Sequence, residues 1–259
     1  MRANTDAMSS ARNLCKCLSA AALIGLFAPC APGLAQSAAP APPAPPSFVV
    51  QPEPPLSPPV QAMVDSVRDA IVRARVRLAR LPPATQDHDI LLRLRDLDEA
   101  TWKAVGQVDF AAIPLDQKIQ AKAAIGALVA PVDQENQGAL LAMLPPEGWF
   151  AISRYGADGE DAAYRVVLHG DIDLWRRFAP VVGRFAAVGE ANGGHYALLS
   201  DRLAVHEGRP QAYGSQVTCT DGVYQPYPID DPEHLDERRL KLGLTPYAVF
   251  EKTFAGVRC

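Results

Sequence analysis

Apolar residues recur at three- and four-residue steps through most of this chain, the spacing that places them on one face of an α-helix. The first such stripe predicts a helix from Val60 to Leu81, which Pro82 and Pro83 end. The same spacing predicts six further helices, over residues 87–105, 114–130, 131–144, 156–170, 171–189 and from the turn at 192–194 to the glycine at 208. Prolines lie at several of these boundaries, where their missing amide hydrogen costs least.

After Gly208 the pattern changes. Residues 216–219 and 223–229 flank Asp221-Gly222, a dipeptide that supplies the positive φ angles of a tight hairpin turn. Two helices then follow, one begun by Asp231-Pro232 and ended at Gly243, the other running from 245–246 to about 254. The predicted fold is predominantly α, a single multi-helix domain of eight or nine helices with one small late β-hairpin.

The N-terminal composition differs from that of the helical part. Residues 1–36 have a basic start, an apolar run from Leu18 to about Phe27 and then small residues, which is typical of a secretory signal peptide. The alternative is a membrane anchor, but the apolar run is shorter than a bilayer span requires. Residues 37–59 hold 10 of the 24 prolines and predict an extended linker or a disordered tail. The globular domain is therefore expected over residues 60–259, in a periplasmic or secreted protein without a membrane span after cleavage.

Cysteine usage and charge fit this location. Beyond the leader the chain has only Cys219 and Cys259, which predict one disulfide in an oxidising compartment, with two free thiols as the alternative. Removing the leader, with its three basic residues and one acidic residue, changes the formal net charge from −4 to −6. A mildly acidic protein has no general attraction for nucleic acid or anionic lipid, so a nucleic-acid partner is not expected.

Polar side chains are densest between Asp201 and Gly243. The candidate site residues are His169, Asp201 and Glu207 as catalytic groups, and Arg202, Gln211, Tyr213, Gln216, Asp236 and Arg239 as binding groups. The chain has no GxSxG, HExxH, P-loop or GxGxxG motif, and no two of its five histidines have ligand spacing on one helix. The sequence therefore predicts no metal and no cofactor.

Many of these residues also have structural interpretations. Asp236 and Arg239 lie three apart and can pair on a helix surface. His169 ends a predicted helix, where an imidazole can bind the last carbonyls. Asp96 and Asp98 lie two apart and point in different directions on their helix, so both are expected to be surface charges.

The order of these elements resembles an uncharacterised bacterial family, a domain of unknown function. The resemblance covers about residues 115–247 and rests on Gly148-Trp149, Tyr155-Gly156, His169 with Asp171, Asp201-Arg202, Glu207-Gly208, Pro210-Gln211, Tyr213-Gly214, Gln216, Pro228-Ile229, Asp231-Pro232, Asp236, Arg238-Arg239 and Gly243-Leu244. This chain departs from the family pattern beside the histidine, where it has Leu168 for a glutamine and Gly170 for an alanine. The resemblance implies a helical domain and implies no activity.

Two classes of function remain open. The first is an exported helical module that binds an unknown protein or a small-molecule ligand, or that has a structural role. The alternative is a periplasmic hydrolase in which His169 or a carboxylate, Asp201 or Glu207, activates water and Arg202 steadies the developing negative charge. The residue types suffice for such a site, but their spacing matches no recognised catalytic motif.

Overall fold

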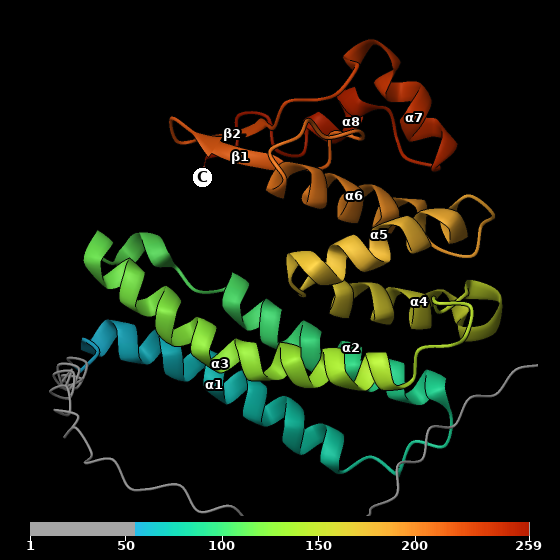
Figure 1. Cartoon of the computed structure of the whole chain (residues 1–259). Coiled ribbons are helices and arrows are strands. Elements are labelled where there is room, and N and C mark those ends of the chain that lie inside the picture. Colours follow the sequence, from blue (N-terminus) through green and yellow to red (C-terminus); the bar gives the residue numbers. More distant parts are fainter. Residues whose placement is uncertain (1–54, 259) are drawn as a thin grey trace, which may run out of the picture. The chain divides into compact units, whose positions relative to one another are not determined.

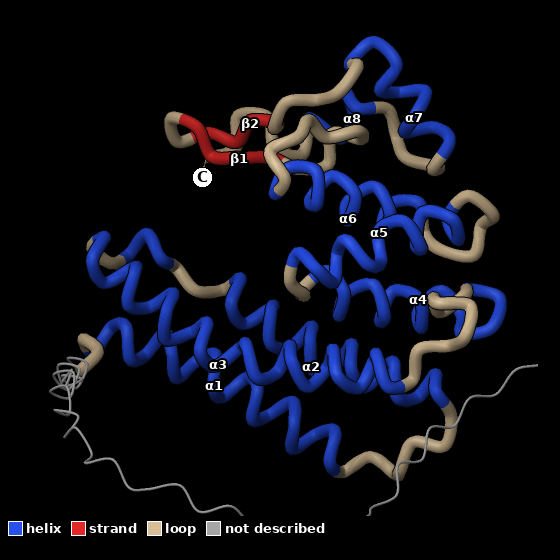
Figure 2. The backbone as a smooth tube through the Cα atoms, viewed as in Figure 1, coloured by secondary structure: helices blue, strands red, loops and turns tan. Residues whose placement is uncertain are grey.

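The structure is a computed structural model of the chain and describes residues 55–258 (Figure 1). The predicted signal peptide, residues 37–54 of the predicted linker, and Cys259 lie outside the described residues. Residues 55–258 form eight α-helices, two short 3-10 helices and one two-stranded antiparallel sheet (Figure 2). The predicted fold class, predominantly α with one small late hairpin, is confirmed. Within this part of the chain, no helix combines the length and the apolar character that crossing a bilayer requires.

The first three helices enclose one hydrophobic cluster. They are α1 (Pro58–Ala79), α2 (Asp87–Gly106) and α3 (Leu115–Ala142), with a 3-10 helix at Phe110–Ala112 between the last two. The predicted stripe of α1 is buried against α2 and α3, together with Leu97, Ile125 and Val129. α1 begins two residues before the predicted boundary at 60, because the prolines of its first turn need no amide partner.

Helix α3 corrects one predicted boundary. The pattern predicts two helices that meet at Pro131, but the structure has a single helix with Pro131 inside it. An interior proline removes one backbone hydrogen bond and costs roughly 3 kcal/mol. Val129 and Val132, on either side of it, are both buried in the α1–α3 cluster. Their packing offsets the cost of the proline and keeps the helix continuous.

A second cluster lies among α4 (Ile152–Leu168), α5 (Ile172–Ala186) and α6 (Gly193–His206). Trp149, Phe150 and Phe178 are its largest fully buried side chains. Helix α2 packs against α4 as well as against α1, and it contributes Leu91 to this second cluster and Leu97 to the first (Figure 1). Helix α2 therefore contributes side chains to both hydrophobic clusters.

The C-terminal segment, which follows α6, consists of a hairpin and two short helices. Strands β1 (Val217–Thr220) and β2 (Val223–Pro226) pair with the register that the Asp221-Gly222 turn predicts, and both turn residues have positive φ. A 3-10 helix at Pro232–His234 leads into α7 (Leu235–Lys241), and α8 (Tyr247–Glu251) follows. Cys219 lies on β1, and the backbone of residues 257–258 lies beside β2. Because Cys259 lies outside the described residues, the disulfide stays a prediction.

Candidate functional site

Asp201, a predicted catalytic residue, organises the loop after α6. Its side chain is fully buried, and its carboxylate accepts hydrogen bonds from the amides of Ala212 (2.7 Å), Tyr213 (3.0 Å) and Ser215 (2.9 Å). Burial raises the pKa of Asp201, and the bonds from Ser215 and Tyr213 act in the opposite direction. A carboxylate with three backbone donors satisfies the loop amides, which accounts for Asp201 without a catalytic role.

Gln211 and Gln216 close the same loop. The side-chain amide of buried Gln211 donates to the carbonyls of Gln216 (2.9 Å) and Tyr227 (3.0 Å), and its oxygen accepts from the Gln216 amide (2.7 Å). The Gln216 side chain turns back to the hydroxyl of Ser215. Gln211 therefore satisfies backbone groups inside closed packing, and the Gln216 side chain is held within the same loop.

Arg239, Asp236 and Tyr213 hold the last helices in place. The buried Arg239 guanidinium donates to the carbonyls of Thr245 (2.8 Å) and Tyr213 (2.5 Å). Asp236 accepts from the Tyr247 amide (2.6 Å) and makes no ion pair with Arg239, so their predicted surface pairing is wrong. The Tyr213 ring lies edge-on to Tyr196, and burial raises the pKa of Tyr213. These three predicted binding residues also serve the fold.

Arg202 and Glu207 lie apart from this loop. Arg202 donates to the carbonyl of Leu168 (2.9 Å), and its guanidinium lies over the Trp175 ring. Burial lowers the pKa of Arg202, which makes no ion pair within residues 55–258. Glu207 is exposed and pairs with Arg209 (2.6 Å) and Arg176 (2.8 Å). Of the two, only Arg202 lies near the backbone that carries His169.

His169 contacts Asp98, which was predicted from the sequence to be a surface charge. Its Nδ1 lies 2.7 Å from Oδ1 of Asp98, whose side chain is only 1% exposed. Asp98 is therefore a buried partner of His169, and the prediction of a surface charge is wrong. An ionised carboxylate can only accept, so Nδ1 donates, and in the neutral imidazole the lone pair is on Nε2. The Trp102 ring stacks on the imidazole at a centroid distance of 4.3 Å.

Asp133 of α3 joins this group through Trp102. The Trp102 indole Nε1 donates to Asp133 Oδ1 at 3.2 Å. Burial raises the pKa of Asp133 to about 6; the Trp102 hydrogen bond and the charge of His169 lower it, while the charge of Asp98 raises it. Two carboxylates, one imidazole and one indole therefore converge where α2, α3 and the end of α4 meet. We call Asp98, Trp102, Asp133 and His169 the polar cluster.

An apolar groove between α2 and α3 leads to this cluster. It encloses about 380 Å³ and is lined by Trp102, Val105, Phe110, Lys122, Ile125, Gly126, Val129, Ala130 and Asp133. Asp133 and Lys122 are its only charged residues, and the Lys122 ammonium lies over the Phe110 ring. Gly126 occurs inside a helix, and a Cβ added there would meet no atom within 4 Å. Because Gly126 lines the groove, we expect a larger side chain at this position to take up part of the groove's volume.

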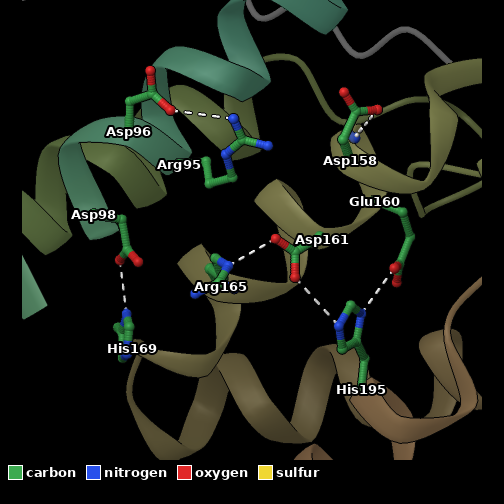
Figure 3. A network of polar contacts seen from close by, with 10 residues as sticks. Arg95, Asp96, Asp98, Asp158, Glu160, Asp161, Arg165, His169 and His195 are labelled. Atoms are coloured by element: carbon green, nitrogen blue, oxygen red, sulfur yellow. Dashed lines mark hydrogen bonds and ion pairs between the residues drawn. The ribbon is translucent and has the colours of Figure 1, made fainter. Parts of the chain in front are cut away.

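A second acid–histidine contact lies in the middle of α4, about two turns before His169 (Figure 3). His195 lies between Glu160 (2.8 Å) and Asp161 (3.4 Å), and the Tyr164 ring stacks on it. Trp149 donates to the other oxygen of Glu160, so this fully buried carboxylate is satisfied on both sides. These contacts join α4 to α6.

Sequence reasoning found His169 and missed its neighbours Asp98, Trp102 and Asp133. For Asp98 the sequence did hold a signal, which is its position on the helix. Asp98 falls within the apolar stripe of α2, where a surface charge is not expected. Asp161, Arg165 and His169 follow at four-residue steps along α4, so they share one face. No sequence spacing relates Asp133 to either group, because only the packing of α3 brings it there.

No curated protein and no solved structure has significant similarity to the chain. A family of unknown function, DUF6624, matches residues 91–255, which run from the first turns of α2 through α8 and include every residue of the polar cluster. Helix α1 precedes the match. Because the match covers well over half of the chain, this protein belongs to the DUF6624 family.

Proposed function

We propose that the domain binds a small ligand whose apolar body lies in the α2–α3 groove and whose polar end meets the polar cluster. The observation that carries the proposal is the Asp133 carboxylate, which lies at an apolar groove with its pKa raised to about 6 by burial. Keeping such a carboxylate half-buried costs stability, and a carboxyl with a raised pKa beside an apolar groove is typical of functional sites.

The groove has the composition of ligand sites in general. Its volume of about 380 Å³ lies within the range of small-molecule pockets, roughly 300–1,000 Å³, whose linings are mostly apolar with a few converging polar groups. Trp102 and Phe110 offer aromatic surface, and the Asp133 oxygens accept hydrogen bonds. A ligand with an aromatic or aliphatic body and an N–H or O–H donor at one end matches this arrangement.

The glycines of α3 allow a matched test. Gly126 lines the groove, whereas Gly138 lies on the same helix away from it, and an added Cβ at either position meets no atom within 4 Å. Replacing an interior helix glycine should stabilise the protein by up to about 1 kcal/mol at both sites. Gly126→Leu should fill the groove, and Gly138→Leu should leave it open.

The probe is N-phenyl-1-naphthylamine, an apolar aromatic amine that fluoresces on leaving water. Wild type and Gly138→Leu should bind it with the same affinity, and Gly126→Leu should lose binding while its melting temperature stays equal or rises. Equal binding by Gly126→Leu would overturn the assignment of the groove.

We also propose hydrolysis as a second candidate function, favoured by the buried Asp98–His169 contact of 2.7 Å. A histidine whose Nδ1 is hydrogen-bonded to a carboxylate can act as a general base through Nε2, as in known acid–base catalytic sites. Nε2 of His169 would take a proton from water as the water oxygen attacks an ester carbon. The ester C–O bond would then break with its electron pair going to the leaving alkoxide, and His169 would pass the proton taken from water to that alkoxide. In this proposal His169 activates water, as the sequence allows, while Asp98 orients the imidazole and Asp201 and Glu207 take no part.

Hydrolysis of p-nitrophenyl esters tests this candidate separately. Asp98→Asn should keep probe binding and lower kcat, because the amide can donate to Nδ1 and so favour the wrong imidazole tautomer. Equal kcat in wild type and Asp98→Asn, or no turnover by wild type, would reject catalysis and leave the binding proposal intact.

We further propose that the protein is exported to the periplasm and processed there. Support comes from the basic and apolar leader and from the two cysteines of the remaining chain. Expression in a Gram-negative host followed by N-terminal sequencing of the periplasmic fraction tests this. A full-length chain that stays in the cytoplasm would contradict it.

A further inference from the structure

The outer face of α1 carries positive charge that contrasts with the rest of the chain. Residues 70–81 contain Arg73, Arg75, Arg77 and Arg80 and no acidic residue, although the whole protein has a formal net charge of −4. Helix α1 packs against α2 and α3 through its buried valines, so these arginines point away from the core. The family match begins only at residue 91, so this face belongs to a helix that precedes it.

Three of these arginines have no partner in the described part of the chain. Arg75 pairs with Glu135 of α3 at 2.6 Å. The exposed side chains of Arg73, Arg77 and Arg80 make no hydrogen bond or ion pair within residues 55–258. Their guanidinium groups are therefore available to an external anion.

Apolar side chains alternate with these arginines. Val72 is 51% exposed, Val76 46% and Leu81 44%. Helical spacing puts 72 and 76 in one row and 73 and 77 in the next. Arg80, the C-cap, and Leu81, which follows the helix, line the same hollow as these four. The six side chains surround a shallow hollow of about 530 Å³. We call these six residues the arginine–valine face.

We propose that the arginine–valine face docks on an anionic, phosphate-bearing lipid surface. A bilayer surface offers phosphates and, just below them, the start of the acyl region, which suits cations and short apolar side chains at the same depth. Arginine also keeps its stem against apolar surface while its head binds phosphate. An acidic polypeptide would match the charge but gives no reason for the exposed valines between the arginines.

Vesicle sedimentation of the full-length chain tests the proposal. The variant Arg73→Gln/Arg77→Gln/Arg80→Gln removes the three unpaired arginines. The control Lys118→Gln/Lys241→Gln/Lys252→Gln removes the same charge from lysines that make no ion pair within residues 55–258. Each arginine near an anionic surface contributes about fivefold to partitioning, so the triple arginine variant should bind phosphatidylglycerol vesicles about 100-fold more weakly. The lysine control should bind like wild type.

Wild type, the arginine variant and the lysine control all keep residues 1–54, which include the basic and apolar leader. A second measurement therefore reports on the arginines of α1 directly. Phenylglyoxal modification, resolved by mass spectrometry, should show Arg73, Arg77 and Arg80 protected by phosphatidylglycerol vesicles and unprotected by phosphatidylcholine vesicles, with Arg154 reactive throughout. Unprotected arginines in α1, or equal partitioning of wild type and the arginine variant, would overturn the proposal. Retention on polyglutamate without any vesicle protection would overturn it in favour of an acidic protein partner.

Discussion

Asp133→Asn should make the protein more stable at neutral pH. The wild-type carboxyl is half-buried at the apolar groove, where burial raises its pKa from 3.8 to about 6. Asparagine keeps an oxygen that can accept from the Trp102 indole, and it carries no charge to desolvate. The substitution therefore removes a cost and preserves the contact.

The magnitude follows from the pKa. A difference of about two pH units between the folded and unfolded states corresponds to roughly 3 kcal/mol. Because the side chain is only partly buried, solvent screening reduces this to about 1.5 kcal/mol. The folded-state pKa is raised, so the carboxyl's contribution to stability is fully present below pH 3.8 and lost as the pH rises through about 6. The advantage of Asp133→Asn should thus grow from pH 4 to 7 and then level off.

Urea denaturation of wild type and Asp133→Asn between pH 4 and 8 measures this difference. Asp69→Asn is the control, since Asp69 is exposed on α1 and makes no hydrogen bond or ion pair within residues 55–258. Its difference from wild type should stay near zero at every pH. A pH-independent difference for Asp133→Asn, or a variant less stable than wild type at pH 8, would refute the electrostatic reasoning.

Three further predictions concern the C-terminal half. Asp201→Ala should lower the free energy of unfolding by about 3 kcal/mol or more, because three loop amides lose their acceptor; a loss below about 1 kcal/mol in urea denaturation would contradict the structural role. Arg239→Lys should cost about 1–2 kcal/mol, seen as a lower melting temperature, because an ammonium lacks the fork that binds two carbonyls. Mass spectrometry without reductant should find the secreted chain lighter by the two thiol hydrogens of Cys219 and Cys259, and an unchanged mass would mean free thiols.

The fold was largely predictable because its signals are local. Buried positions of α1 repeat at helical spacing, and Asp221-Gly222 specifies its turn without help from distant residues. Pro131 was misplaced because a proline at a boundary and a proline inside a well-packed helix look the same in sequence. Only the burial of the valines on either side of it distinguishes the two cases.

The candidate site was less predictable because its members come from three helices. The density of polar residues predicted a site within residues 201–243. In the structure, buried side chains there, such as Asp201, Gln211 and Arg239, satisfy backbone groups. The polar cluster has no such density, since it takes Asp98 from α2 and Asp133 from α3. Tertiary packing alone brings these carboxylates to His169.

The indole signals of the three tryptophans test the central claim most directly. Trp102 lines the groove, whereas Trp149 and Trp175 are buried in the second hydrophobic cluster. In ¹H–¹⁵N spectra titrated with N-phenyl-1-naphthylamine, the Trp102 indole signal, assigned with Trp102→Phe, should move while the other two stay in place. An unmoved Trp102 signal with bound probe, or movement of Trp149 and Trp175 alone, would contradict a ligand site between α2 and α3.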